Sequence, residues 1–392
     1  MMSEGLTHIK GDRVIWMVVI LLSLLSLLAV YSSTGTLAYK YQEGNTIYYM
    51  IKHLIILALG FVLMYLAHKV KYTYYSRIFQ VALYIAIPLL IVTLFFGKDV
   101  NEAKRALPLP FGLTFQASDL AKLTLIIYLA RILTKKQDAK HDFKSLFVPV
   151  MVPIIVVCGL ILPSNLSTAV MLFITSLVLL FIGRIRWLNL LRLVGIAAGA
   201  MVLFICVLLM MPKDKQGRLE TWKHRLETFF SGGGEEEDQV VQSKIAVASG
   251  GVFGKMPGNS TQRNFLSHPY SDFIFAIVME EYGLIGGSFV VLLYMILLFR
   301  AVRIVTKIPR TFGAFLTIGV AFSLVFQALI NMGVAVDLLP VTGQPLPLVS
   351  MGGTSIWFTS LSIGIILSVS KEVTKGAKDE EPEEIQEKYA TA

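Results

Sequence analysis

The chain has 392 residues, of which 55% are hydrophobic and 16% are charged, and its formal net charge is +9. A chain of this size that is so apolar and so poor in charge is excluded from the class of soluble globular proteins. The positive charge does not indicate nucleic-acid binding, because lysine and arginine gather in alternate loops between long apolar runs. The composition therefore predicts a protein embedded in a membrane.

About ten runs of roughly 18 or more mostly apolar residues are long enough to cross a bilayer as helices. They predict an all-α polytopic membrane protein in which residues 1–371 form one transmembrane domain. The first run follows Lys10 and Arg13 without a convincing cleavage site, so we expect it to be retained as a signal anchor. The predicted spans are Val14–Tyr31, Tyr49–Leu66, Ile78–Phe96, Asp119–Leu133, Leu146–Leu162, Leu166–Gly183, Leu188–Met211, Phe273–Phe299, Phe312–Met332 and Thr354–Ser370.

The distribution of basic residues predicts the side of the membrane on which each loop lies. Lysine and arginine are concentrated in every second loop, for example in 69–77, 135–144 and 300–310, and such loops face the cytoplasm. Both termini are then cytoplasmic, and the one large loop, 212–271, between the seventh and eighth spans is extracytoplasmic. We expect the acidic tail, 372–392, to be a disordered cytoplasmic end.

The loop between the third and fourth spans carries cations on a side where positive charge is otherwise sparse. Arg105 is a candidate for binding phosphate, because a guanidinium group matches phosphate oxygens in pairs; the alternative is an ordinary surface cation. Asp119 and Lys122 lie three residues apart at the start of the fourth span, so they share one helix face and can pair. Ser118 and Asp119 are equally typical of a helix N-cap and first turn, and both interpretations stay open.

The large loop combines three kinds of sequence. Residues 213–229 carry basic residues and an apolar stripe, which is typical of a helix on the membrane surface and also of a packed loop helix. Residues 231–238 are typical of a flexible acidic linker. The glycine-rich run from Ser249 to Ser260 could bring backbone amides close to phosphate oxygens, but it lacks the Gly-Lys-Ser/Thr ending of a Walker loop.

Asp272 lies directly before the apolar run of the eighth span. A carboxylate at the boundary between water and hydrocarbon favours a functional role, because burying it there is unfavourable unless it faces water, a partner or a substrate. The alternative is that Asp272 caps the helix that follows it. Residues 339–353, before the last span, are apolar and rich in proline and glycine, and they predict a re-entrant segment that lines a cavity.

The sequence contains no histidine cluster with ligand spacing, no serine, histidine and acid set, and no convincing internal repeat. The two cysteines, Cys158 and Cys206, both lie inside predicted spans and far apart in the sequence. They predict neither a disulfide nor a metal site.

Four stretches together resemble the SEDS family (shape, elongation, division and sporulation), over residues 11–371. The FtsW and RodA members of this family are peptidoglycan glycosyltransferases. The loops of this chain are closer in style to the FtsW branch, whereas the Pro-Val-Thr-Gly run that begins at Pro340 also resembles RodA relatives. The four stretches are Lys104–Arg105 with Gln116–Lys122; Pro163–Thr168; Gln242–Ser260 with Ser271–Ala276 and Glu280–Gly283; and Asn331–Gly333 with Leu339–Ser355. The last two are highly specific in combination.

The resemblance implies an enzyme of ten spans that polymerises lipid II, the undecaprenyl-diphosphate-linked disaccharide pentapeptide, during septal cell-wall synthesis in the bacterial inner membrane. By this similarity Asp272 corresponds to the family's essential acid, and we expect it to act as general base on the acceptor hydroxyl. Arg105, Lys122 and Lys255 are expected to stabilise the departing diphosphate. The other expected substrate-binding residues are Asp119, Gln242, Ser243 and Ser355.

The resemblance also implies partners: a class B penicillin-binding transpeptidase and other division proteins. A magnesium or manganese ion could assist at the diphosphate, because these hard cations prefer oxygen ligands. Two other classes stay open, a flippase or transporter of the lipid-linked precursor and a non-catalytic scaffold for a transpeptidase. The absence of an inverted repeat in the sequence argues against transport.

The chain departs from the family pattern at three positions. Asn165 stands where the family has aspartate, which puts a charged role there in doubt. Ala106 follows Arg105 where a tryptophan is usual, so that loop could be placed differently. Asp119 stands where glutamate is usual, and the shorter acid should still pair with Lys122.

Overall fold

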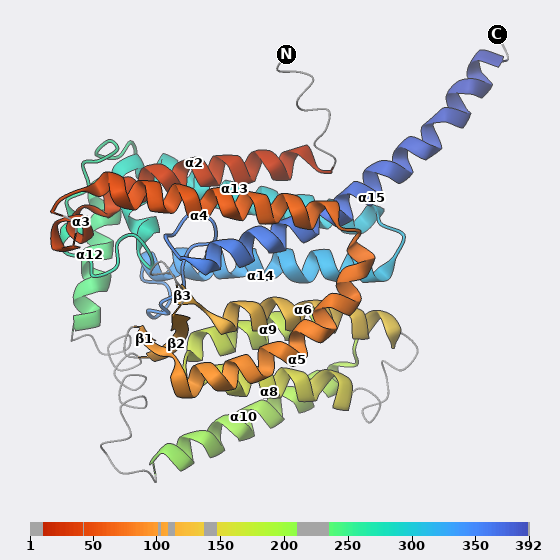
Figure 1. The fold of residues 1–392 in the computed structure, drawn as a ribbon, viewed down its shortest axis with the longest axis horizontal. Helices are drawn as coiled ribbons and strands as arrows, with labels where there is room; N and C mark the ends of the chain where they lie inside the picture. The colour runs from red at the N-terminus through yellow and green to blue at the C-terminus, as the bar shows by residue number, and fades with distance from the viewer. Residues whose placement is uncertain are drawn as a thin grey trace.

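The computed structural model describes residues 11–41, 43–100, 103–108, 114–136, 147–209 and 235–390. They form a bundle of helices that run back and forth along one axis (Figure 1). In this described part, six helices are long and apolar enough to cross a membrane, so the chain is a polytopic membrane protein. The six are α2 (Arg13–Ser33), α4 (Thr46–Lys69), α5 (Tyr72–Phe96), α13 (Ile274–Lys307), α14 (Thr311–Ala335) and α15 (Thr354–Ala390).

Shorter helices complete the bundle, and a π-helical turn, Phe147–Met151, leads into one of them. The predicted spans are helical over their described residues, except that Leu162, Gly183 and Phe273, at the ends of three spans, lie in turns. The shorter helices are α6 (Ala117–Lys135), α8 (Val152–Ile161), α9 (Leu166–Ile182) and α10 (Trp187–Leu209).

The connection between α5 and α6 adds a small sheet to the otherwise all-α fold. Three short strands form an antiparallel sheet there in the order β1, β2, β3. Backbone groups that leave a helix need other partners, and pairing between strands supplies them in this connection. The strands are β1 (Lys98–Val100), β2 (Ala103–Pro108) and β3 (Thr114–Phe115).

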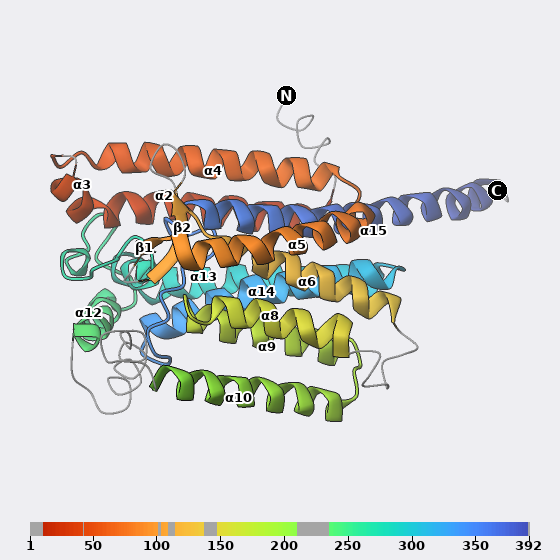
Figure 2. The ribbon, with the colours of Figure 1, turned by 60° about the horizontal axis from the view of Figure 1, so that its bottom comes forward.

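The two ends of the bundle differ in what they carry. The three strands, α3 (Gly35–Tyr41), α12 (Glu235–Gly250) and the 3-10 turn Gln262–Asn264 gather at one end, which we call the loop end (Figure 1). The beginning of α2 and the far end of α15 lie at the opposite end. α10 lies at the edge of the bundle, beyond α8 and α9 (Figure 2).

Two stretches expected to be irregular are helical. Residues 235–238 of the expected acidic linker form the first turn of α12, and α15 continues to Ala390 through the acidic tail. Glutamate and lysine are good helix formers, and acidic residues in a first turn are stabilised by the helix dipole. The expected surface helix, 213–229, lies outside the described residues.

A kink in α13 explains the glycine-rich run that precedes it. At Gly283 the backbone has φ +66° and ψ −166°, which interrupts the helix. The carbonyl oxygen of Glu280 accepts a hydrogen bond from the Lys255 amide, at 2.9 Å. A Cβ on Gly254 would lie 2.2 Å from the carbonyl oxygen of Glu281, so glycine is needed for the two backbones to approach. Gly250, Gly254 and Gly283 thus serve contact between backbones, whereas Gly251 and Gly258 have open space around the Cβ position.

The predicted re-entrant segment, residues 339–353, packs its middle part, residues 344–350, inside the protein. Its backbone is irregular, yet Leu346, Leu348 and Val349 are buried. Irregular backbone in a membrane protein needs hydrogen bonds from its surroundings. Side chains from three helices supply them: Ser26 to Val349 O, Tyr294 to Pro347 O, Gln327 to Pro345 O, and Asn331 to Gln344 O.

Candidate functional site

Asp272 lies at the loop end, just before α13, and its side chain is partly exposed. Its Oδ1 accepts a hydrogen bond from the Ser271 hydroxyl at 2.9 Å. The N-cap of α13 is Phe273, and no side chain caps that helix, so the interpretation of Asp272 as a helix cap is wrong. No lysine or arginine among the described residues forms an ion pair with it. Among the described residues, the Asp272 carboxylate therefore has Ser271 as its side-chain partner and no basic counter-ion.

The backbone around Asp272 is fixed by the re-entrant segment and α14. The Asn331 amide nitrogen donates to the carbonyl oxygen of Asp272 at 2.8 Å. The Ser350 hydroxyl donates to the carbonyl oxygen of Ser271 at 2.6 Å. Two neighbouring carbonyls are thus held by side chains that come from different elements, which orients the acid.

Tyr270 lies two residues before Asp272, and its phenol interacts electrostatically with the Asp272 carboxylate. Burial raises the pKa of Tyr270, and the negative charge of Asp272 raises it further. The phenol therefore stays protonated at neutral pH and remains a hydrogen-bond donor beside the carboxylate.

Asp119 and Lys122 form the predicted ion pair, with Asp119 Oδ1 and Lys122 Nζ 2.8 Å apart. Ser118 is not the N-cap of α6, because that position is Gln116 and no side chain caps the helix, whereas Asp119 does lie in the first turn, as the alternative interpretation expects. Asp119 is 4% exposed, and its second oxygen, Oδ2, has no partner among the described residues. An unpartnered buried carboxylate oxygen is unfavourable without water or a ligand.

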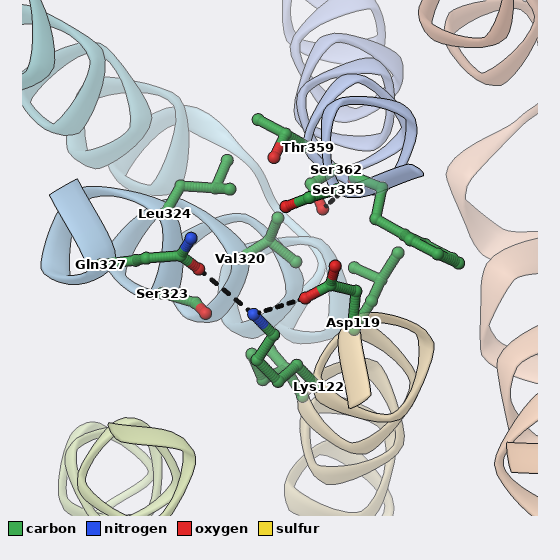
Figure 3. A pocket seen from close by; sticks show the side chains of 12 residues that line it. Asp119, Lys122, Val320, Ser323, Leu324, Gln327, Ser355, Thr359 and Ser362 are labelled. Carbon is green, nitrogen blue, oxygen red and sulfur yellow. Dashed lines mark hydrogen bonds and ion pairs between the residues drawn. The ribbon is translucent and has the colours of Figure 1, made fainter. Parts of the chain in front are cut away.

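The pair opens onto a small cavity between α6, α14 and α15, which is lined by both polar and apolar side chains (Figure 3). The cavity has a volume of about 30 Å³, which is room for about two water molecules. Ser355, expected to bind substrate, lines it together with Asp119 and Lys122. The polar side chains that complete its lining are Ser323, Gln327, Thr359 and Ser362.

Two amides on one face of α14 connect the cavity to Asp272. Gln327 accepts a hydrogen bond from Lys122 Nζ at 3.2 Å and donates one to Pro345 O at 2.9 Å. Asn331, four residues on, donates to the carbonyl oxygens of Asp272 and Gln344. A continuous network therefore runs from the ion pair through the re-entrant segment to the acid at the loop end.

The break between α8 and α9 joins this network at one residue. Thr168 Oγ1 accepts a hydrogen bond from the side-chain amide of Gln344 at 2.7 Å. Asn165, which replaces the aspartate of the family, is the N-cap of α9, and its side chain accepts from the Thr168 amide at 3.1 Å. A neutral amide is sufficient for that role.

The structure places the remaining predicted site residues elsewhere. Lys255 Nζ pairs with Glu280 Oε1 at 2.7 Å, and the Ser243 hydroxyl donates to Ala335 O at 2.7 Å. Gln242 lies half-buried on α12. Arg105 lies in β2, and its side chain is outside what the structure describes.

A metal ion bound by protein groups alone does not fit the described residues. No three histidine, cysteine, aspartate or glutamate side chains come together among them. The unpartnered oxygen of Asp119 lies beside the Lys122 ammonium group, which repels a cation.

Sequence reasoning did not select Gln327, Asn331 or Gln344 as site residues, although Asn331 and Gln344 lie in stretches that carry the family resemblance. Gln327 and Asn331 are amides four residues apart inside a run that is otherwise almost entirely apolar. Polar residues inside a span face the interior of the bundle, and a spacing of four places both on one face. The polar character and spacing of Gln327 and Asn331 were therefore sufficient to select both residues. Gln344 lies in an irregular segment, where no helical spacing could indicate its role.

The family comparison covers nearly the whole chain. The FtsW, RodA and SpoVE family, described as cell cycle protein, matches residues 12–375. The chain belongs to this family. Together with the apolar helices, membership makes it a multi-pass protein of the bacterial inner membrane.

Individual members of the family are similar over nearly their whole length. The "Probable peptidoglycan glycosyltransferase FtsW" of Geobacter sulfurreducens is 32% identical over 387 residues, covering 94% of this chain and 97% of that protein. The crystal structure of RodA, a rod shape determining protein of Thermus thermophilus, is 26% identical with a TM-score of 0.65, covering 93% and 98%. A chain of a peptidoglycan synthase complex has the same fold, with a TM-score of 0.72 at 24% identity over 93% and 98%.

Proposed function

We propose that this chain is a peptidoglycan glycosyltransferase that polymerises lipid II, with Asp272 as its general base. Membership of the family and the activity named for its FtsW relatives support the reaction class. The observation that carries the assignment of Asp272 is its carboxylate, which is partly exposed, caps no helix and is held through its backbone by Asn331.

In the proposed reaction, the 4-hydroxyl oxygen of the acceptor sugar attacks the anomeric carbon of the donor sugar. A glycosidic carbon–oxygen bond forms, and the bond to the lipid diphosphate breaks. Asp272 takes the proton of the attacking hydroxyl, which makes that oxygen a better nucleophile. The diphosphate leaves as an anion, so no second carboxyl group is needed to protonate it.

The developing charge on the diphosphate requires cations. Lys122 is the described candidate, because Asp119 and Gln327 fix its ammonium group at the cavity between α6, α14 and α15. Arg105 remains a candidate from the sequence. We assign Lys255 to the stability of the glycine-rich loop instead, because Glu280 binds it. Any magnesium or manganese ion would be held mainly by diphosphate oxygens, and no step above depends on it.

The lipid tail must stay in the bilayer while the sugars react. An apolar groove of about 260 Å³ lies between α8, α9 and α10, on the side of the bundle where α10 stands at the edge (Figure 2). Its lining, for example Leu162, Phe173 and Met201, suits a polyprenyl chain. We propose that the tail occupies this groove.

The proposed orientation has ten crossings, cytoplasmic termini and the loop end outside the cytoplasm. It is supported by the alternation of basic loops in the sequence. The similarity to FtsW favours a role at the division septum, with a class B transpeptidase and other division proteins as partners.

The test is polymerisation of lipid II by the purified protein in detergent, with and without the transpeptidase. Asp272→Asn should reduce the rate about 10²- to 10⁴-fold, because it removes the base, while insertion and thermal unfolding stay as in the wild type. Asp337→Asn is the matched control, because it removes a partly exposed carboxylate that no step of the reaction uses. Polymerisation by Asp272→Asn at the wild-type rate would refute the base. No polymer from the wild-type protein, with or without the transpeptidase, would instead favour a transporter or a scaffold.

A further inference from the structure

A buried histidine on α4 has no place in the reaction above. His53 is 0% exposed, and its Nε2 lies 2.7 Å from the hydroxyl oxygen of Ser26 on α2. A polar ring in the interior of a membrane bundle is unfavourable unless it forms hydrogen bonds. Its other nitrogen, Nδ1, has no partner among the described residues, so the contact with Ser26 is its one polar interaction there.

The hydrogens of this contact can be assigned from the partners. Ser26 donates its single hydroxyl hydrogen to the carbonyl oxygen of Val349, at 2.7 Å. It must therefore accept from His53, which carries its proton on Nε2 and leaves Nδ1 bare. His53 thus fixes the direction in which the Ser26 hydroxyl points.

The carbonyl of Val349 belongs to a part of the re-entrant segment that needs tethering. Val349 is 0% exposed, and the preceding residue, Leu348, has φ +64°, a conformation that a leucine rarely adopts. Side-chain hydroxyls hold the carbonyls on both sides of it, Tyr294 at Pro347 and Ser26 at Val349. Such strain persists only where the surroundings fix it.

The residue after Val349 reaches the site directly. Ser350 donates its hydroxyl hydrogen to the carbonyl oxygen of Ser271, whose own hydroxyl donates to Asp272 Oδ1. The line from His53 to Asp272 therefore crosses α4, α2, the re-entrant segment and the start of α13.

We propose that His53 is a positioning residue for the reaction: by orienting Ser26 on the carbonyl of Val349, it fixes the re-entrant segment that holds Ser271 and Asp272. The proposal rests on the proposed role of Asp272, and it concerns geometry and not proton transfer by the histidine itself.

Glutamine and asparagine at position 53 form a matched pair of test variants. The glutamine amide nitrogen reaches about as far from the backbone as Nε2 of histidine, whereas that of asparagine reaches only as far as Nδ1. His53→Gln should keep the bond to Ser26 and a rate near that of the wild type. His53→Asn should lower kcat about tenfold, because Asp272 would be displaced by less than about an ångström from the attacking hydroxyl. KM should change little, because the groups that bind the substrate are still present.

Hydrogen exchange measures the bridge independently of catalysis. His53→Asn and Ser26→Ala should each speed amide exchange in residues 346–350, and His53→Gln should not. The kcat losses of His53→Asn and Ser26→Ala should not multiply in the double variant, because both break one connection. His68→Asn is the control: this histidine is also buried on α4, at the other end of the helix, and should leave kcat and this exchange unchanged.

Three results would overturn the proposal: wild-type exchange and kcat in His53→Asn, a loss in His53→Gln as large as in His53→Asn, or multiplied losses in the double variant. If Asp272→Asn polymerises normally, the base assignment fails, whereas the exchange results still decide whether His53 fixes the segment.

Discussion

Two buried carboxylates, Asp119 and Glu280, each pair with a lysine, at 2.8 Å and 2.7 Å. Glu280 is 0% exposed, and both of its oxygens are saturated by donors from the glycine-rich loop. Asp119 shares its lysine with Gln327 and leaves one oxygen without a partner at a cavity. The donors to Glu280 are Lys255 Nζ, Ser260 Oγ, Thr261 N and Oγ1, and Gln262 N.

The difference separates structure from function. A carboxylate whose lone pairs are all used holds a loop to a helix and has nothing left for a ligand. A carboxylate that keeps a free oxygen beside a cavity retains capacity to bind, at some loss of stability. Substitutions in the Glu280 region should therefore affect unfolding, and those in the Asp119 region should affect turnover.

The largest effect on stability is expected at Gly283, where the kink in α13 lets the helix backbone form hydrogen bonds with the glycine-rich loop. A Cβ on Gly283 would lie 2.3 Å from the carbonyl oxygen of Val252, and its φ is +66°. Gly283→Ala should lower the free energy of unfolding by about 4 kcal/mol, from strain and overlap together. Gly251→Ala is the control, with φ +54° and open space around the Cβ, and should lower it by about 1 kcal/mol. Equal losses in chemical unfolding would contradict this interpretation.

Removing the saturated acid should be the next largest change. Glu280→Ala leaves Lys255 and the donors around Ser260 without their acceptor, and should lower the free energy of unfolding by about 3 kcal/mol. Glu280→Gln keeps an acceptor oxygen and should lose less. Chemical unfolding in mixed micelles measures both, and a loss below about 1 kcal/mol for the alanine variant would count against the assignment.

Substitution in the pair of Asp119 and Lys122 should reduce activity more than stability. Lys122→Met should reduce polymerisation about 100-fold, or about 2.7 kcal/mol in the barrier, because a cation for the leaving group is removed. Its unfolding should change less than that of Glu280→Ala, because water in the cavity can solvate Asp119. The double variant Asp119→Asn with Lys122→Met should regain stability but no activity. Recovery of polymerisation there would show that the pair is structural.

An exposed ion pair with the same separation should contribute least to the free energy of unfolding. Lys244 and Asp337 are 2.8 Å apart, with 51% and 33% of their side chains exposed. Lys244→Ala should change the free energy of unfolding by less than about 1 kcal/mol and leave polymerisation unaltered. A larger change would mean that the length of an ion pair, and not its burial, decides its contribution.

The helices of this protein could be predicted because hydropathy and length are properties of a single run. The predicted run Phe312–Met332 lies within α14, and Asp119 and Lys122 pair because three residues of one helix determine their spacing. The ion-pair partner of Lys255 could not be predicted in this way. Its partner, Glu280, lies 25 residues further along the chain, beyond a loop whose path depends on the kink at Gly283.

By itself the sequence determined that the chain lies in a membrane, where its helices run, and to which family it belongs, since hydropathy and motifs are read along the chain. Only the tertiary structure decided that Asp272 is no cap, that three of the glycines serve backbone contact, and that Gln327 and Asn331 join the ion pair to the acid. The physical reason is that a side chain's hydrogen-bond partners are set by packing between elements that lie far apart in the sequence.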